Sequence, residues 1–115
     1  MLDRDLAELY LMNHGEKIWT VSELNRLVKE VLEQTFYPFR LRGEVSNLTI
    51  HRSGHVYFTL KDSRSQVHAV FFRGAAEARR LGLKEGMALE VRGRLSVYEP
   101  RGTYQIIVDL INPLG

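Results

Sequence analysis

The side chains most able to do chemistry in this sequence are its four histidines, His14, His51, His55 and His68. His51 and His55 are four residues apart, but the Ser53-Gly54 pair between them is typical of a loop, so they are not expected to share a helical face. The sequence has no cysteine and no His-Glu-x-x-His pattern. A zinc site is therefore not expected.

Carboxylates offer a second route to catalysis, as ligands for metal ions in a nuclease. Such a site needs several carboxylates converging on one cleft. Here the candidates are spread over different predicted strands and turns: Glu44, Asp62, Glu99 and Asp109. The sequence also has no Walker loop and no Gly-x-Gly-x-x-Gly motif for phosphates. We therefore expect that this chain alone is not an enzyme and that it holds no metal or cofactor.

The basic side chains are concentrated in the second part of the chain. Residues 39–115 contain 12 basic and 7 acidic side chains, whereas residues 1–38 contain 4 basic and 7 acidic ones. Ten of those 12 basic residues are arginine, which forms paired hydrogen bonds to phosphate and stacks on flat rings. This bias favours an anionic partner, although an ordinary solvated surface fits the charge equally well.

One helix can be placed with its start and its end. Thr20 and Glu23 have the spacing of a capping box, in which each side chain accepts the other residue's backbone amide. Apolar residues follow at helical spacing, and Pro38 prevents continuation because it has no amide to donate. The pattern predicts a helix over residues 21–34.

After Pro38 the apolar period changes from helical to strand-like. Strands are predicted from residue 39 and over residues 56–61, 67–73, 87–98 and 103–111, with a short helix over 74–81 and a tight turn at 99–102. Five strands with a helix between the third and fourth are the element order of the OB-fold, a mainly β Greek-key barrel. Gly43 and Gly93 stand in the two long strands, where a closing barrel needs a bulge or kink.

In an OB-fold, a single nucleic-acid strand binds across strands 2 and 3, between the loops that join strands 1–2 and 4–5. Stacking aromatics and a basic groove hold it there. In strand 2, alternation assigns Val56, Phe58 and Leu60 to the core. The predicted nucleic-acid-binding residues are Arg42, Arg52, His55, Tyr57, Lys61, His68, Phe72, Arg73, Arg94, Tyr98, Arg101 and Tyr104.

Each of these assignments has a plainer alternative. Phe72 beside Arg73 suits stacking on a base next to a phosphate, but the ring could equally pack under the helix at 74–81. The arginines at 42, 92 and 94 could line the groove or form a solvated strand surface. Tyr57 could pack its ring while it exposes its hydroxyl.

Several of these segments also resemble the large subunit of exodeoxyribonuclease VII, in order and at that family's spacing. The similar segments are Thr20-Val21-Ser22-Glu23-Leu24-Asn25, Gly43-Glu44-Val45-Ser46-Asn47, residues 53–62 (SGHVYFTLKD), residues 69–74 (AVFFRG) and residues 97–105 (VYEPRGTYQ). Together they cover about residues 19–114.

The resemblance implies that residues 19–115 are the OB-fold domain that begins such a subunit and delivers single-stranded DNA to a catalytic domain. The catalytic residues and the surface for the small subunits would lie outside this chain. The resemblance also selects DNA, because stacking and phosphate contacts alone fit RNA as well. Cytoplasmic location is expected, and the lack of cysteine fits it.

Residues 1–18 form an N-terminal extension that departs from the family pattern. Leu2, Leu6, Leu9 and either Met12 or Asn13 lie near one face of a possible amphipathic helix over residues 2–13. This apolar stripe is the basis of an alternative function, an assembly module that forms homodimers through the extension. The acidic residues here argue against a secretory signal, and no apolar run is long enough to span a membrane.

Overall fold

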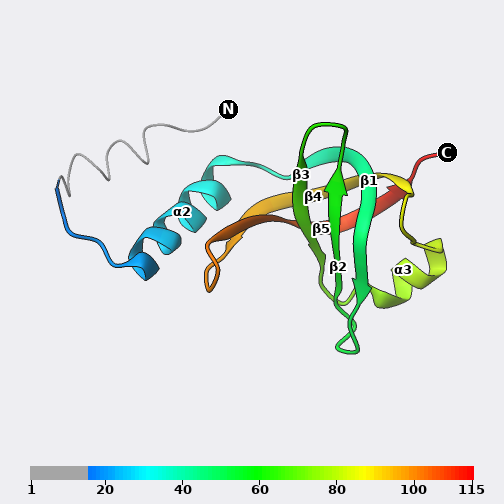
Figure 1. The fold of residues 1–115 in the computed structure, drawn as a ribbon, viewed down its shortest axis with the longest axis horizontal. Helices are drawn as coiled ribbons and strands as arrows, with labels where there is room; N and C mark the ends of the chain where they lie inside the picture. The colour runs from blue at the N-terminus through cyan, green and yellow to red at the C-terminus, as the bar shows by residue number, and fades with distance from the viewer. Residues whose placement is uncertain (1–15) are drawn as a thin grey trace.

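The computed structural model describes residues 16–115, so the predicted helix in the N-terminal extension lies outside the described residues. Within them the strands close into a five-stranded barrel in the order β1-β2-β3-β5-β4. The elements are α2 (Val21–Thr35), β1 (Phe39–Ile50), β2 (Val56–Lys61), β3 (Gln66–Phe71), α3 (Ala75–Leu81), β4 (Ala88–Tyr98) and β5 (Thr103–Pro113) (Figure 1). The mainly β OB-fold barrel and the helices predicted over residues 21–34 and 74–81 are confirmed.

The core fills the barrel with side chains from alternate strand positions. On β2, Val56, Phe58 and Leu60 are buried, as the alternation predicts. Phe71, the last residue of β3, packs against this core, whereas the next residue, Phe72, is exposed. The interpretation of Phe72 as a core residue under α3 is therefore wrong. The other buried members are Val45, Ala69, Ala75, Ala78, Leu83, Leu89, Val91, Ile106, Val108 and Ile111.

The bend in β1 does not lie at Gly43, where the sequence suggested it. The register of β1 with β2 shifts between Ser46 and Thr49. Asn47 adopts a φ of 52° there, and the carboxylate of Glu85 accepts hydrogen bonds from the amides of Asn47 (3.1 Å) and Leu48 (2.6 Å). A side-chain acceptor reaching from 37 residues away thus satisfies the backbone groups that the bulge frees.

The two strand glycines allow neighbouring strands to approach closely. A Cβ on Gly43 would lie 2.7 Å from Cγ of Leu60, and one on Gly93 would lie 2.3 Å from the carbonyl oxygen of Ile107. At Gly93 the register of β4 with β5 also shifts, as predicted for a closing barrel. A Cβ would therefore displace the Leu60 side chain at Gly43 and the β5 backbone at Gly93.

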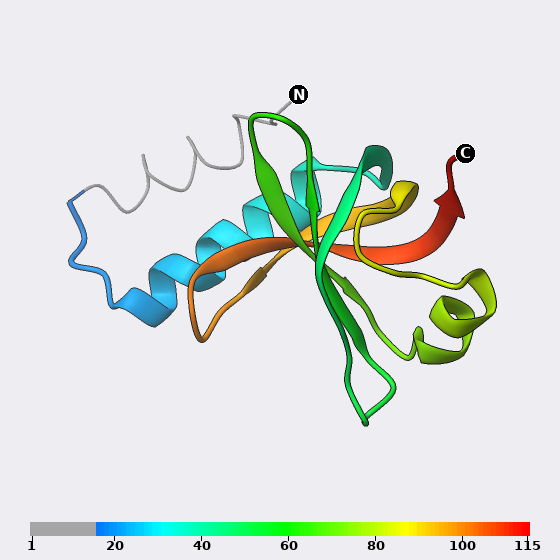
Figure 2. The ribbon, with the colours of Figure 1, turned by 45° about the vertical axis from the view of Figure 1, so that its right-hand side comes forward.

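α2 lies along the hairpin formed by β4 and β5, which projects from the barrel (Figures 1 and 2). The predicted capping box is present, with reciprocal hydrogen bonds between Thr20 and Glu23. Polar contacts join the helix to the hairpin. The Asn25 amide donates to the carbonyl of Glu99 at 3.0 Å, and the Ser96 hydroxyl donates to the Glu33 carboxylate at 2.6 Å.

Candidate nucleic-acid interface

The outer face of β2, β3 and β5 carries a row of side chains that strand pairing places side by side. Tyr57 pairs with Val70, and Val70 pairs with Ile107. Two residues along, and therefore on the same face, His68 lies beside Gln105. These residues contribute to a hollow that continues to the β4–β5 turn, lined by Tyr57, Phe58, His68, Ala69, Val70, Tyr98, Arg101, Thr103 and Gln105.

A second hollow adjoins the first and lies between α2, the end of β3 and the hairpin. Its lining includes Phe72 and Arg94, with Lys29 and Glu33 from α2. Both hollows are lined by Tyr98 and Gln105, so they adjoin each other. We call the two hollows together the aromatic groove, because Tyr57, Phe72 and Tyr98 line them and are 38%, 49% and 48% exposed.

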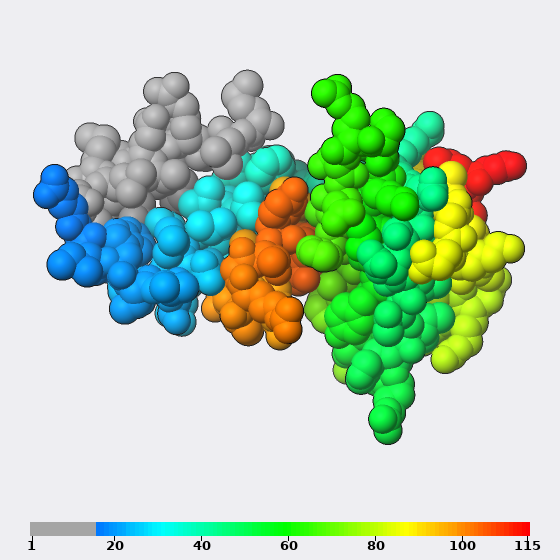
Figure 3. All heavy atoms as spheres, in the orientation of Figure 1, coloured from blue at the N-terminus to red at the C-terminus, as the bar shows by residue number. Residues whose placement is uncertain are grey.

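The space-filling view shows how this part of the molecule is assembled. The hairpin, drawn in orange, is seated between α2 and the part of the barrel formed by β2 and β3 (Figure 3). α2 therefore borders the hollow that contains Phe72 and Tyr98. The sequence did not predict this position for α2, and Lys29 and Glu33 were not among the predicted site residues.

Phe72 is held in a defined orientation by its neighbours. Its ring forms a T-shaped pair with the His55 imidazole, with ring centroids 5.2 Å apart and planes at 89°. Nδ1 of His55 accepts a hydrogen bond of 2.9 Å from the backbone amide of Arg73, which has a φ of 55°. This bond requires the Nδ1 lone pair, so neutral His55 carries its proton on Nε2. His55 thus positions the Phe72-Arg73 pair.

The cations around the groove fall into two groups. Arg94 lies 3.7 Å from the Glu33 carboxylate, and Lys29 lies 3.6 Å from that of Glu99. In contrast, the side chains of Arg52, Arg73 and Arg101 have no carboxylate partner within residues 16–115 and are exposed. Arg52 and Arg73 stand near the loop before β2, and Arg101 stands in the β4–β5 turn. The groove therefore has unpaired positive charge near both loops that flank it.

Three predicted site residues lie elsewhere. Arg42 and Lys61 line a different hollow together with Tyr104, and Arg42 pairs with Glu90 at 3.2 Å. Tyr104 pairs with Val97, whereas Tyr98 pairs with Thr103. Because neighbouring residues of a strand face opposite sides of the sheet, the two tyrosines lie on opposite sides of the hairpin. Conversely, Gln105 lies within the groove but was not predicted. Thr103, Gln105 and Ile107 are two residues apart along β5 and so share one face. This alternation could have placed Gln105 on the same face as Thr103.

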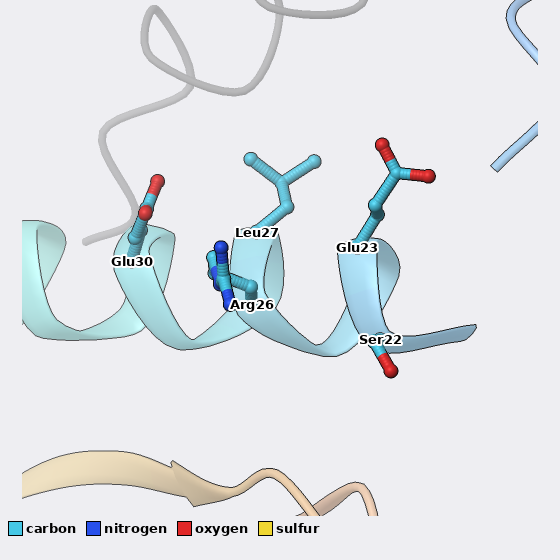
Figure 4. Close-up of a pocket in the computed structure, with 5 residues that line it drawn as sticks. All are labelled: Ser22, Glu23, Arg26, Leu27 and Glu30. Atoms are coloured by element: carbon cyan, nitrogen blue, oxygen red, sulfur yellow. The ribbon is translucent and has the colours of Figure 1, made fainter. Parts of the chain in front are cut away.

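A further hollow lies on α2, away from the groove. Figure 4 shows Glu23, Leu27 and Glu30 there, pointing away from the hairpin. The pKa of Glu23 is lowered to about 2, first by the hydrogen bond from Lys17 and then by the amide and hydroxyl of Thr20. Its carboxylate therefore serves the helix cap. Over residues 16–115, no three histidine or acidic side chains gather as metal ligands, and no helix is long and apolar enough to cross a membrane.

A closed five-stranded barrel of this topology is an OB-fold, and a groove of exposed aromatics is typical of the OB-folds that bind single-stranded nucleic acid. The chain belongs to the OB-fold nucleic acid binding domain family, whose model matches residues 19–112. The resemblance to exodeoxyribonuclease VII is also confirmed. The chain is 51% identical over 100 residues to the exodeoxyribonuclease 7 large subunit of Geotalea uraniireducens (strain Rf4), and 52% identical over 97 residues to that of Helicobacter pylori (strain J99).

These alignments cover 87% and 84% of this chain but only 22% and 23% of the relatives, so the chain spans about a fifth of their length. Solved structures agree on the fold. A replication protein A heterotrimer bound to ssDNA matches with a TM-score of 0.57 at 15% identity, covering 70% of this chain and 60% of that one. Asparaginyl-tRNA synthetase from Pyrococcus horikoshii matches with 0.59 at 19% identity, covering 77% and 22%.

Proposed function

We propose that this chain is the single-stranded DNA-binding domain of an exodeoxyribonuclease VII large subunit, and that it delivers the strand to a catalytic domain elsewhere in that subunit. One observation carries the proposal: exposed aromatic rings follow one another along a groove that has unpaired arginines near both flanking loops. Bases stack on such rings whatever their sequence, while guanidinium groups contact the phosphates between them.

The named arginines give the proposal a quantitative form. Arg52, Arg73 and Arg101 would neutralise three phosphates, and each phosphate on a single strand contributes about 0.7 to the salt slope. The logarithm of affinity should therefore fall with the logarithm of salt at a slope of about 2. Arg101→Ala should reduce this slope by about 0.7, whereas Arg42→Ala should leave it unchanged because Arg42 lies outside the groove.

The experiment is fluorescence anisotropy of a labelled single-stranded DNA, with unlabelled single-stranded DNA, RNA and duplex DNA as competitors. We expect single-stranded DNA to compete best and duplex worst, because paired bases cannot stack on the rings. Absence of binding at low salt with micromolar protein would contradict the proposal for this domain. Equal competition by RNA would instead indicate a general single-strand-binding domain.

An assembly role is the second candidate, and one observation favours it. Val21, Leu24 and Val28 are exposed on α2 although they are apolar. They lie at positions i, i+3 and i+7, which share one side of a helix. If a second copy of the chain covers this row, sedimentation equilibrium should detect dimers that Leu24→Glu dissociates. A monomer at all concentrations would exclude the role.

A further inference from the structure

The aromatic groove contains an acidic side chain where a nucleic-acid surface is expected to be basic. Glu33 of α2 lines the same hollow as Phe72 and Tyr98. Its Oε2 atom accepts a 2.6 Å hydrogen bond from the hydroxyl of Ser96, a residue that is only 5% exposed. Arg94 approaches the same oxygen at 3.7 Å. The carboxylate is therefore held in one orientation by a buried hydroxyl and a cation.

The second carboxylate oxygen of Glu33, Oε1, has no hydrogen-bond partner among residues 16–115. The carboxylate therefore retains an unused acceptor in a hollow that two exposed rings help to line. The amide of Gln105, which can both donate and accept, lines the hollow as well. The hollow thus combines apolar ring surface with a small number of fixed polar groups.

A phosphate group does not suit this hollow. The two cations that line it are already near carboxylates, Arg94 at Glu33 and Lys29 at Glu99. A phosphate would face both carboxylates at short range. A planar base suits it better, because its face can stack on a ring while its edge meets the fixed acceptor.

We propose that this hollow is a base-selective subsite in which Glu33 determines specificity by accepting a hydrogen bond from an exocyclic amino group. Cytosine offers such a group at N4, and carboxylates are its usual protein partners. Thymine has a carbonyl oxygen at the equivalent position, which the carboxylate repels. The inference rests on the proposed function, since it assigns a preference to the same groove.

The test compares the binding of oligo(dC) and oligo(dT) of equal length, because the two pyrimidines stack alike and differ at the base edge. Both are measured at the same mildly alkaline pH. The native domain should bind oligo(dC) about tenfold more tightly, the size expected for one good base-edge contact. Glu33→Gln should reduce the preference to about twofold, because the amide can donate to thymine O4 as well as accept. Ser96→Ala, which frees the carboxylate, should also reduce it.

Glu30→Gln is the matched control. Glu30 lies on the same helix but lines the hollow on the side that points away from the hairpin (Figure 4), so its replacement should leave the preference intact. Equal binding of the two oligonucleotides by the native domain, or a preference that survives Glu33→Gln in a folded protein, would overturn the subsite while the groove stands. If neither oligonucleotide binds, the proposed function itself fails.

Discussion

Replacing Phe72 by alanine separates a binding role from a structural one. The ring is 49% exposed and stands outside the barrel core, so about half of its surface is available to a base. Removing one base-stacking ring costs roughly 1–3 kcal/mol of binding free energy, which corresponds to a roughly 5- to 150-fold rise in Kd. We expect a change in this range for single-stranded DNA.

The effect on folding should be smaller than that of a core aromatic. Half of a phenylalanine side chain buries on the order of 100 Å², which at about 25 cal/mol per Å² gives an upper limit of about 2.5 kcal/mol. Phe71→Ala is the matched comparison, because Phe71 packs against the core and should lose about 3–5 kcal/mol. Phe71→Ala protein that remains folded should still bind DNA.

Anisotropy titration and urea denaturation of the same preparations measure the two quantities. Tyr37→Ala serves as the exposed-aromatic control, since Tyr37 is 84% exposed and lies outside the groove lining. His55→Ala should weaken binding less than Phe72→Ala, and the double variant should be less than additive because His55 acts through the ring. A Kd for Phe72→Ala within about twofold of the native value would refute the stacking argument.

Three further predictions concern the scaffold. Gly93→Ala should lower the free energy of unfolding by about 3 kcal/mol in urea denaturation, because the new Cβ would meet the backbone carbonyl of Ile107, which cannot rotate away. Near-native stability would contradict this close approach. Glu85→Gln should cost about 1–2 kcal/mol by the same measurement, because one amide oxygen replaces a carboxylate that serves two backbone amides. An unchanged unfolding midpoint would show that the bulge does not depend on the carboxylate. Glu23 has its pKa lowered from 4.5 to about 2 by Lys17 and the helix cap, so its contribution to stability is present above pH 4.5 and disappears as the pH falls toward 2. The difference in unfolding free energy between native protein and Glu23→Gln should therefore shrink over that interval, and a constant difference would contradict it.

The parts of the fold that local chemistry determines were predictable from the sequence. The α2 start follows from two side chains three residues apart, and its end from the proline after it. The core face of β2 follows from strict alternation of Val56, Phe58 and Leu60. The same alternation shows that Phe71 and Phe72 face opposite ways, but only the folded barrel shows which of them the core covers.

The features that join distant segments were not predictable. The bulge at Asn47 depends on Glu85, and the pairing of Arg94 depends on Glu33, more than sixty residues earlier in the chain. Arginine content therefore overstated the free positive charge on the strands, because tertiary contacts neutralise Arg42 and Arg94. Candidate site residues in the loops could be selected from the sequence because the OB-fold places those loops beside the binding face. Candidates on the strands could not, because the face on which they lie depends on how the strands pair.

The closed barrel has a consequence for how another polypeptide can join this domain. The barrel closes where Phe39–Glu44 of β1 pair with Ala88–Gly93 of β4. The hairpin of β4 and β5 continues beyond this paired region. Over residues 16–115, β4 after Gly93 is therefore paired on one edge alone. A partner strand could extend the sheet at that edge, where α2 already lies close.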